Sequence, residues 1–145
     1  MSIAPRTIER GGHIFAHYIP REYRPDGINF LTPDDYSIQA GLLSHPAGHT
    51  IQDHLHNPKA HFDVKSYQEF LYLESGSIQV KIYDLDWSLI DTLELRPGDI
   101  LLQVYGGHGF DVTEKSCLIE VKQGPYSKDQ KMRFTRLDVP DGITT

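Results

Sequence analysis

The chain has 145 residues, of which 39% are hydrophobic and 23% are charged, and its formal net charge at pH 7 is -6. These values predict one globular domain over residues 1–145, and the acidic balance argues against nucleic acid or an anionic membrane as partners. Three observations lead us to expect a cytoplasmic protein. Cys117 is the only cysteine, no stretch is long and apolar enough to span a membrane, and the N-terminus lacks a secretory signal.

Short stretches typical of β-strands follow one another along the chain, and turn-forming Gly, Pro and Asp residues separate them. Residues 1–11 are expected to form a loose N-terminal arm, and residues 12–19 alternate in the manner of an edge strand. Further strands are expected at residues 36–43, 50–56, 69–74, 77–83, 89–95, 100–104, 108–112, 117–123 and 133–139. Ser75-Gly76 indicates a hairpin turn, and residues 96–99 indicate a second turn.

About ten short strands at this spacing, without a convincing helix, are typical of an all-β antiparallel sandwich or barrel. A jelly roll fits the pattern. We expect fewer than about a tenth of the residues to be helical. The insertion at residues 57–67 has no periodicity, and a loop of this length beside a site is often a lid or a specificity loop. Flexible surface is favoured over alternative metal ligands within it.

Three polar side chains between residues 54 and 69 suggest a metal site. His54 and His56 are two residues apart, so an extended chain places both imidazoles on one face. Glu69 shares a face with Leu71 and Leu73, and a carboxylate that faces a core must be paired or bound to a metal. An Arg partner for Glu69, and a solvated surface for the two histidines, are the simpler alternatives.

These residues, with His108 further along, suit one divalent transition metal, which could be Fe, Mn, Ni, Zn or Cu. Four protein ligands would leave one or two positions open on a five- or six-coordinate ion, as in a catalytic site. Lys122 and Glu120 share a strand face and form either a solvated pair or, on an inward face, a charge for an anionic substrate group. Tyr72, Gln103 and Tyr105 are candidates for contacts near the barrel mouth.

The spacing of these residues resembles two motifs of the cupin superfamily. The first falls on Gly48, His54, His56, Glu69 and Gly76, and the second on Gly98, Gly106 and His108. The chain departs from both motifs: 12 residues separate His56 from Glu69, Val104 stands in place of a proline, His108 comes one residue early, and the closing Asn is missing. The resemblance implies a jelly-roll barrel with the metal ligands His54, His56, Glu69 and His108.

Residues 106–110, 119–126 and 133–134 are also similar to small bacterial cupins from gene clusters for polysaccharide or sugar-nucleotide metabolism. This resemblance implies a small-molecule ligand derived from a sugar. The function expected is a metal-dependent enzyme of the isomerase, epimerase or oxygenase type. A non-catalytic metal- or ligand-binding module and a jelly roll without metal remain as alternatives. A homodimer is expected, because exposed sheet edges need cover.

Overall fold

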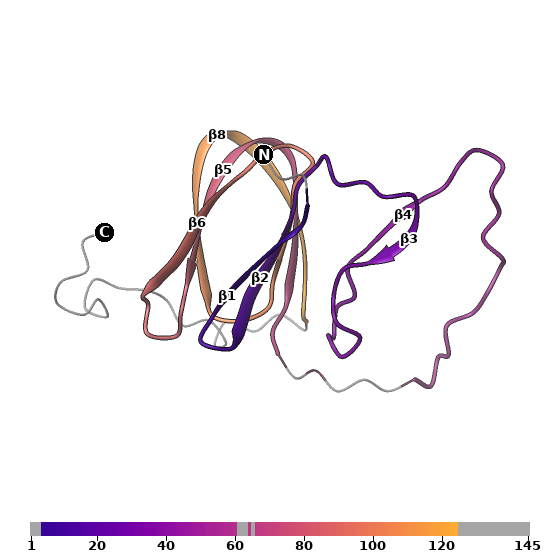
Figure 1. Cartoon of the computed structure of the whole chain (residues 1–145), viewed down its shortest axis with the longest axis horizontal. Helices are drawn as coiled ribbons and strands as arrows, with labels where there is room; N and C mark the ends of the chain where they lie inside the picture. Colours follow the sequence, from indigo (N-terminus) through magenta and orange to yellow (C-terminus); the bar gives the residue numbers. More distant parts are fainter. Residues whose placement is uncertain (1–3, 61–63, 65, 125–145) are drawn as a thin grey trace.

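The computed structural model describes residues 4–60, 64 and 66–124, and all the regular elements within them are β-strands (Figure 1). The strands are β1 (Arg6–Arg10), β2 (His13–Ile19), β3 (Gly27–Phe30), β4 (Gly41–Ser44), β5 (Glu69–Tyr83), β6 (Leu89–Leu95), β7 (Ile100–Gln103) and β8 (Gly107–Lys122). Every pairing between them is antiparallel, which confirms the predicted fold class at the level of an all-β antiparallel protein. No helix capable of crossing a lipid bilayer occurs among the described residues.

The long strand β5 lies at the centre of a six-stranded, curled sheet. β8 pairs along one edge of β5, from Glu69 opposite Lys122 to Tyr83 opposite Gly107. The other edge of β5 is shared, because β7 pairs with its first residues and β6 with its last. β2 pairs with β7, and β1 completes a hairpin with β2. In Figure 1 these strands wrap around a common interior, while the small β3–β4 sheet lies to one side.

Strands β5 and β7 supply the apolar side chains on the two faces of the curled sheet. The inner face carries Leu71, Leu73, Ile78, Val80 and Ile82, which are buried together in the main core. The outer face of β7 carries Leu102, and residues 36–40 cover it with Tyr36, Ile38 and Ala40. The core therefore fills the inside of the curl, and a second cluster fixes the segment between β3 and β4 against its outside.

The predicted hairpin at Ser75-Gly76 is wrong, because β5 continues through both residues as one strand of 15 residues. Gly76 has a φ of 91°, and the pairing with β8 shifts register on both sides of it, as in a β-bulge. A side chain at Gly76 would collide with Ser116 and the backbone of Lys115. β8 is likewise one strand of 16 residues, where two separate strands were expected.

Other segments also differ from expectation. Arg6–Arg10, predicted as part of a loose arm, form β1, and ion pairs of Arg6 with Asp91 (2.9 Å) and Arg10 with Asp84 (2.7 Å) tie this strand to the β6 side. Residues 27–30 form an unexpected strand, residues 36–40 are irregular, and residues 50–56 form no strand. The strand predicted at residues 133–139 lies outside the described residues.

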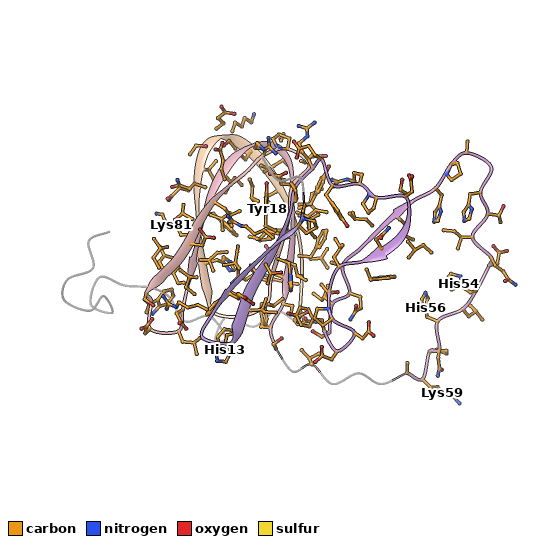
Figure 2. The ribbon with its side chains drawn as sticks, viewed as in Figure 1. His13, Tyr18, His54, His56, Lys59 and Lys81 are labelled. Atoms are coloured by element: carbon orange, nitrogen blue, oxygen red, sulfur yellow. The ribbon has the colours of Figure 1, made fainter. Side chains whose placement is uncertain are left out.

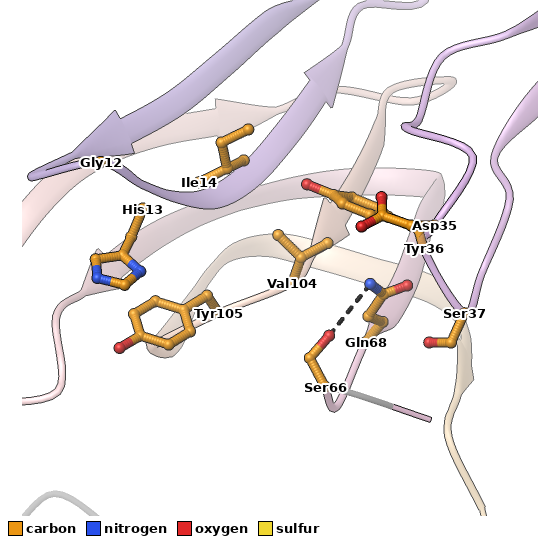
Figure 3. A pocket seen from close by; sticks show the side chains of 10 residues that line it. All are labelled: Gly12, His13, Ile14, Asp35, Tyr36, Ser37, Ser66, Gln68, Val104 and Tyr105. Atoms are coloured by element: carbon orange, nitrogen blue, oxygen red, sulfur yellow. Dashed lines mark hydrogen bonds between the residues drawn. The ribbon is translucent and has the colours of Figure 1, made fainter. Parts of the chain in front are cut away.

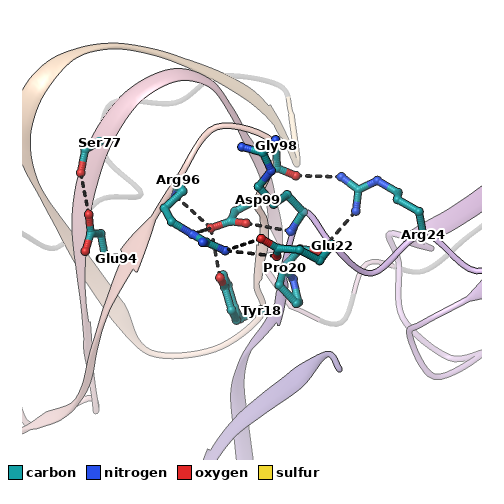
Figure 4. Close-up of polar contacts among 10 residues, drawn as sticks. Tyr18, Pro20, Glu22, Arg24, Ser77, Glu94, Arg96, Gly98 and Asp99 are labelled. Atoms are coloured by element: carbon teal, nitrogen blue, oxygen red, sulfur yellow. Dashed lines mark hydrogen bonds and ion pairs between the residues drawn. The ribbon is translucent and has the colours of Figure 1, made fainter. Parts of the chain in front are cut away.

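The predicted turn at residues 96–99 is confirmed, and the buried carboxylate of Asp99 holds it (Figure 4). This carboxylate accepts hydrogen bonds from the Tyr18 hydroxyl (3.0 Å) and from the backbone N–H groups of Arg21 (2.8 Å) and Arg96 (2.9 Å). Burial and the adjacent Asp99 carboxylate raise the pKa of Tyr18, so its hydroxyl remains a donor. Asp99 therefore joins the end of β2 to the turn between β6 and β7.

Candidate functional site

Two of the four predicted metal ligands lie together on the inner face of the curled sheet. Glu69 begins β5 and His108 lies at the start of β8, and Oε2 of the carboxylate is 3.2 Å from Nε2 of the imidazole. The Glu69 side chain is only 10% exposed and the His108 side chain is 24% exposed. The two residues come close because the curl of β5 brings its start near the chain that opposes its end. The alternation of Glu69 with Leu71 and Leu73 therefore predicted the direction of this carboxylate correctly.

Gln103 on β7 and Lys122 on β8 flank Glu69, because both lie directly opposite it in the register. Gln103 is buried, its Nε2 donates to the carbonyl of Tyr105 (2.7 Å), and its Oε1 has no hydrogen-bond partner among the described residues. An unpaired buried amide oxygen is costly, and it marks this end of the sheet as a place where a further polar group fits. Sequence reasoning placed Gln103 near the mouth, but it gave no signal for the unpaired oxygen.

Lys122 forms an ion pair with Glu120 (3.1 Å) on the face that carries Glu69 and Leu71. The hydrogen bond to Glu120 and the charge of that carboxylate raise the pKa of Lys122, and Glu69 adds to the effect. The register places both residues on the strand face of Glu69 and Leu71, but Glu120 is exposed and Lys122 is only half-buried, so they form the solvated pair that the sequence favoured. Lys122 brings a positive charge to the neighbourhood of Glu69 and His108.

His54 and His56 lie apart from this pair, on an exposed extended segment. Figure 2 shows both labelled histidines on the long chain beyond the β3–β4 sheet, away from the curled sheet. Their rings make an edge contact with centroids 5.1 Å apart, and Nδ1 of His54 lies 2.8 Å from the carbonyl oxygen of Gln52. Among the described residues, no three His, Cys, Asp or Glu side chains form a group that could hold a metal ion. In this arrangement a metal at Glu69 and His108 would have only two protein ligands.

Protein groups occupy the space beside Gly106 and Gly107. Gly106 has a φ of 74°, and a side chain there would meet the Tyr83 carbonyl and the Phe15 ring. A side chain at Gly107 would press on the Trp87 ring. The glycines therefore allow the chain to bend tightly from β7 into β8.

One edge of β8, the strand that carries His108, has no neighbouring strand among the described residues. In the part of the chain that the structure describes, β8 pairs only with β5. Residues 46–60 are all exposed, and the backbone hydrogen bonds found within them join close neighbours in the chain. Within the described ranges the structure thus contains both a strand edge without a neighbour and an exposed segment without a strand partner, and an edge of this kind is a template for strand addition.

Comparison of the chain with protein-family models, with curated proteins and with solved structures gives no match. The geometry around Glu69 and His108 is therefore the basis for any conclusion about function.

Proposed function

We propose that this protein is a cupin-type jelly roll that binds one divalent transition metal with Glu69 and His108 and acts as a metal-dependent enzyme on a small polar molecule. The observation that carries the proposal is the contact of a nearly buried carboxylate with an imidazole on the inner face of the curled sheet. These two residues come from two separate sequence motifs, and both types of side chain are ligands for Fe, Mn, Ni, Zn and Cu.

His54 and His56 would complete the ligand set by a movement of the exposed segment. Residues 45–68 join β4 to β5, and an extended chain spans about 3.3 Å per residue, so residues 50–56 have ample length to reach β8. Addition of residues 50–56 to the free edge of β8 would satisfy backbone groups on both strands. Alternation would then point both imidazoles to the same side, toward Glu69 and His108. We infer that metal binding and this strand addition occur together.

The bound metal would supply Lewis acidity toward an oxygen of the substrate. The chain itself contributes the groups that surround that oxygen. Lys122 offers a positive charge on the same strand face as Glu69, suited to an anionic or developing negative group. The Oε1 atom of Gln103 is an acceptor for a substrate hydroxyl, because it has no hydrogen-bond partner among the described residues. A sugar-derived molecule, with adjacent oxygens and hydroxyl donors, fits these groups, and the reaction class is isomerisation, epimerisation or oxidation.

The direct contact of His108 with Glu69 also favours a second candidate function. A protonated His108 satisfies the carboxylate without a metal, and the barrel would then be a non-catalytic ligand-binding module. The two candidates differ in metal content and in the response of a bound metal to small molecules.

Elemental analysis of the purified full-length chain tests the proposal. We expect about one transition-metal ion per chain, and a large loss of metal in Glu69→Gln, in His108→Ala and in the double variant His54→Ala/His56→Ala. His49→Ala is the matched control, because His49 is an exposed histidine of the same segment and is not a proposed ligand. Equal metal content in all of these proteins, or none in any, would reject the metal site.

The second step separates an enzyme from a binding module. Metal-containing protein is titrated with sugar phosphates, nucleotide sugars and small organic acids, and the X-ray absorption signal of the metal is followed. An open coordination position predicts that at least one sugar compound perturbs the signal. If no compound perturbs it, the metal is coordinatively closed and the binding module is the better description.

A further inference from the structure

A pocket lies on the outer face of the curled sheet, opposite to the face that carries Glu69, between the sheet and the segment that follows β3 (Figure 3). Its volume is about 310 Å³, at the lower end of the range of small-molecule sites, so one or two rings would fill it. Ile14 and Val104 form an apolar floor, and His13 and Tyr105 stack on one another with ring centroids 4.8 Å apart. Figure 3 shows Tyr36, Asp35 and Gln68 on the other side of this pocket.

Hydrogen bonds from three strands or strand ends fix the wall opposite the aromatic pair. The Tyr36 hydroxyl bonds to Nε2 of the buried His17 (3.2 Å), and Oγ of Ser37 donates to Oε1 of Gln123 (3.0 Å). The backbone N–H of Ile38 donates to Oε1 of Gln68 (2.9 Å). Because the wall is held to the sheet at three successive residues, the pocket is largely formed in advance of binding, and little ordering would oppose a ligand.

The polar groups of the pocket define what it can accept. Gln68 is almost completely buried, and its Nε2 atom gives one hydrogen bond to Ser66 (3.3 Å), which leaves its second amide hydrogen for a ligand acceptor. Asp35 contributes the only carboxylate of the lining, and neither Lys nor Arg lines the pocket among the described residues. The negative charge of Asp35, with no cationic side chain in the described lining to offset it, opposes the binding of an anionic ligand.

We propose that this pocket is a second binding site, for an uncharged or cationic ring compound. The ring would stack against the His13–Tyr105 pair, donate hydrogen bonds to Asp35 and accept one from Gln68. The site is separate from the proposed metal site, because Gln68 and Glu69 are neighbours on an extended chain and point to opposite faces of the sheet. Its ligand need not be the substrate of the metal site, and phosphorylated compounds are expected to bind it more weakly than their uncharged counterparts.

Two pairs of probes that differ in charge test this proposal on the full-length protein. Guanosine is compared with guanosine 5′-monophosphate, and tryptamine with indole-3-acetate, by protein-observed NMR titration. We expect saturable shifts at the backbone amides of Gly12, Ser37 and Ser66 with guanosine or tryptamine. The anionic member of each pair should bind roughly tenfold or more weakly, because the members of each pair differ by about two charges beside Asp35.

Variants locate the binding. Tyr105→Ala should abolish it, and Asp35→Asn should reduce the difference between tryptamine and indole-3-acetate. Asp34→Asn is the control, because it removes the neighbouring exposed carboxylate, which does not line the pocket. The proposal is overturned if no probe shifts these amides, if the anions bind as tightly as their partners, or if Asp34→Asn acts like Asp35→Asn. Neither Glu69 nor His108 lines the pocket, so loss of the metal site would leave these results unchanged.

Discussion

At the scale of the residue, two buried carboxylates differ in how completely their surroundings satisfy them. Asp99 is fully buried, but three donors surround it and no open side remains for a ligand. Glu69 is nearly buried with one imidazole as its neighbour, beside an amide oxygen that lacks a hydrogen-bond partner among the described residues. The first carboxylate is fully satisfied by its donors, whereas a buried acceptor without a partner among the described residues lies beside the second.

Replacement of Asp99 by Asn is expected to destabilise the fold. The amide presents one acceptor oxygen and two hydrogens to three donors, so at least one buried donor loses its partner. We expect a loss of about 2–4 kcal/mol in the free energy of unfolding, measured by urea denaturation. Asp86→Asn, in the exposed turn before β6, should change it by less than about 1 kcal/mol. Equal effects of the two substitutions would show that the Asp99 contacts do not hold the turn.

Gly76 allows a comparison between backbone strain and packing. Gly76→Ala places a side chain at a φ of 91° against Ser116 and Lys115, whereas Gly27→Ala meets a similar φ of 80° in open space. We expect the first substitution to cost at least about 1 kcal/mol more in unfolding free energy than the second. Thermal and urea unfolding of both variants provide the measurement. An equal loss of unfolding free energy in both variants would show that β8 shifts at the bulge to make room for the added side chain.

At the scale of the element, the sequence predicted strands well where alternation continues between clear turn signals. Residues 13–19 and 89–95 form strands as expected, because alternation and a turn-former at each end define them. Ser75-Gly76 was misinterpreted because a glycine with positive φ serves a bulge as well as a hairpin. Only the presence of partner strands on both edges of β5 decides between the two, and local sequence does not contain that information.

The candidate site was predictable in part for the same reason. The direction of Glu69 follows from local alternation, and the proximity of His108 agrees with the motif pattern. His54 and His56 lie on a segment that pairs with no strand in the part of the chain that the structure describes, so local spacing gives their common face but not their position. The pocket beside Tyr36 could not be predicted, because it depends on contacts among residues far apart in the chain.

At the scale of the element, His17 on β2 should make the free energy of unfolding depend on pH. Burial lowers the pKa of His17 from its ordinary value of 6.5, so the folded state keeps this imidazole neutral between Thr7 and Tyr36. Below pH 6.5 the unfolded chain binds the proton more readily than the folded chain, and the free energy of unfolding must therefore fall as the pH falls. His17→Gln should weaken this dependence between about pH 6.5 and 5, as measured by urea unfolding at several pH values. His13→Gln, at an exposed histidine of the same strand, serves as the control.

At the scale of the whole molecule, the β3–β4 sheet presents an uncovered apolar face. Ile28 lies opposite Leu43, and Phe30 lies over Gly41, with exposed fractions of 58%, 55% and 59% for the three apolar side chains. Two-stranded sheets are marginally stable on their own. Contact with the same face of a second copy of the chain would bury these side chains and stabilise the small sheet. Such a contact would form the homodimer that is expected from the sequence.

Measurement of the mass in solution tests the dimer. We expect light scattering after size exclusion to give twice the chain mass of 16.5 kDa, and Phe30→Lys to shift the mass toward that of one chain. Leu85→Lys alters an exposed apolar side chain on the turn before β6 and should leave the mass unchanged. A mass of one chain at all concentrations would reject the dimer.

The central claim is that His54, His56, Glu69 and His108 meet at one metal, and X-ray absorption at the edge of the bound metal tests it most directly. We predict a first shell of nitrogen and oxygen at about 2.0–2.2 Å with scattering from three imidazoles. His54→Ala/His56→Ala should reduce that scattering to a single imidazole in whatever metal remains. A first shell without imidazole, or a spectrum that the double substitution leaves unchanged, would contradict the account.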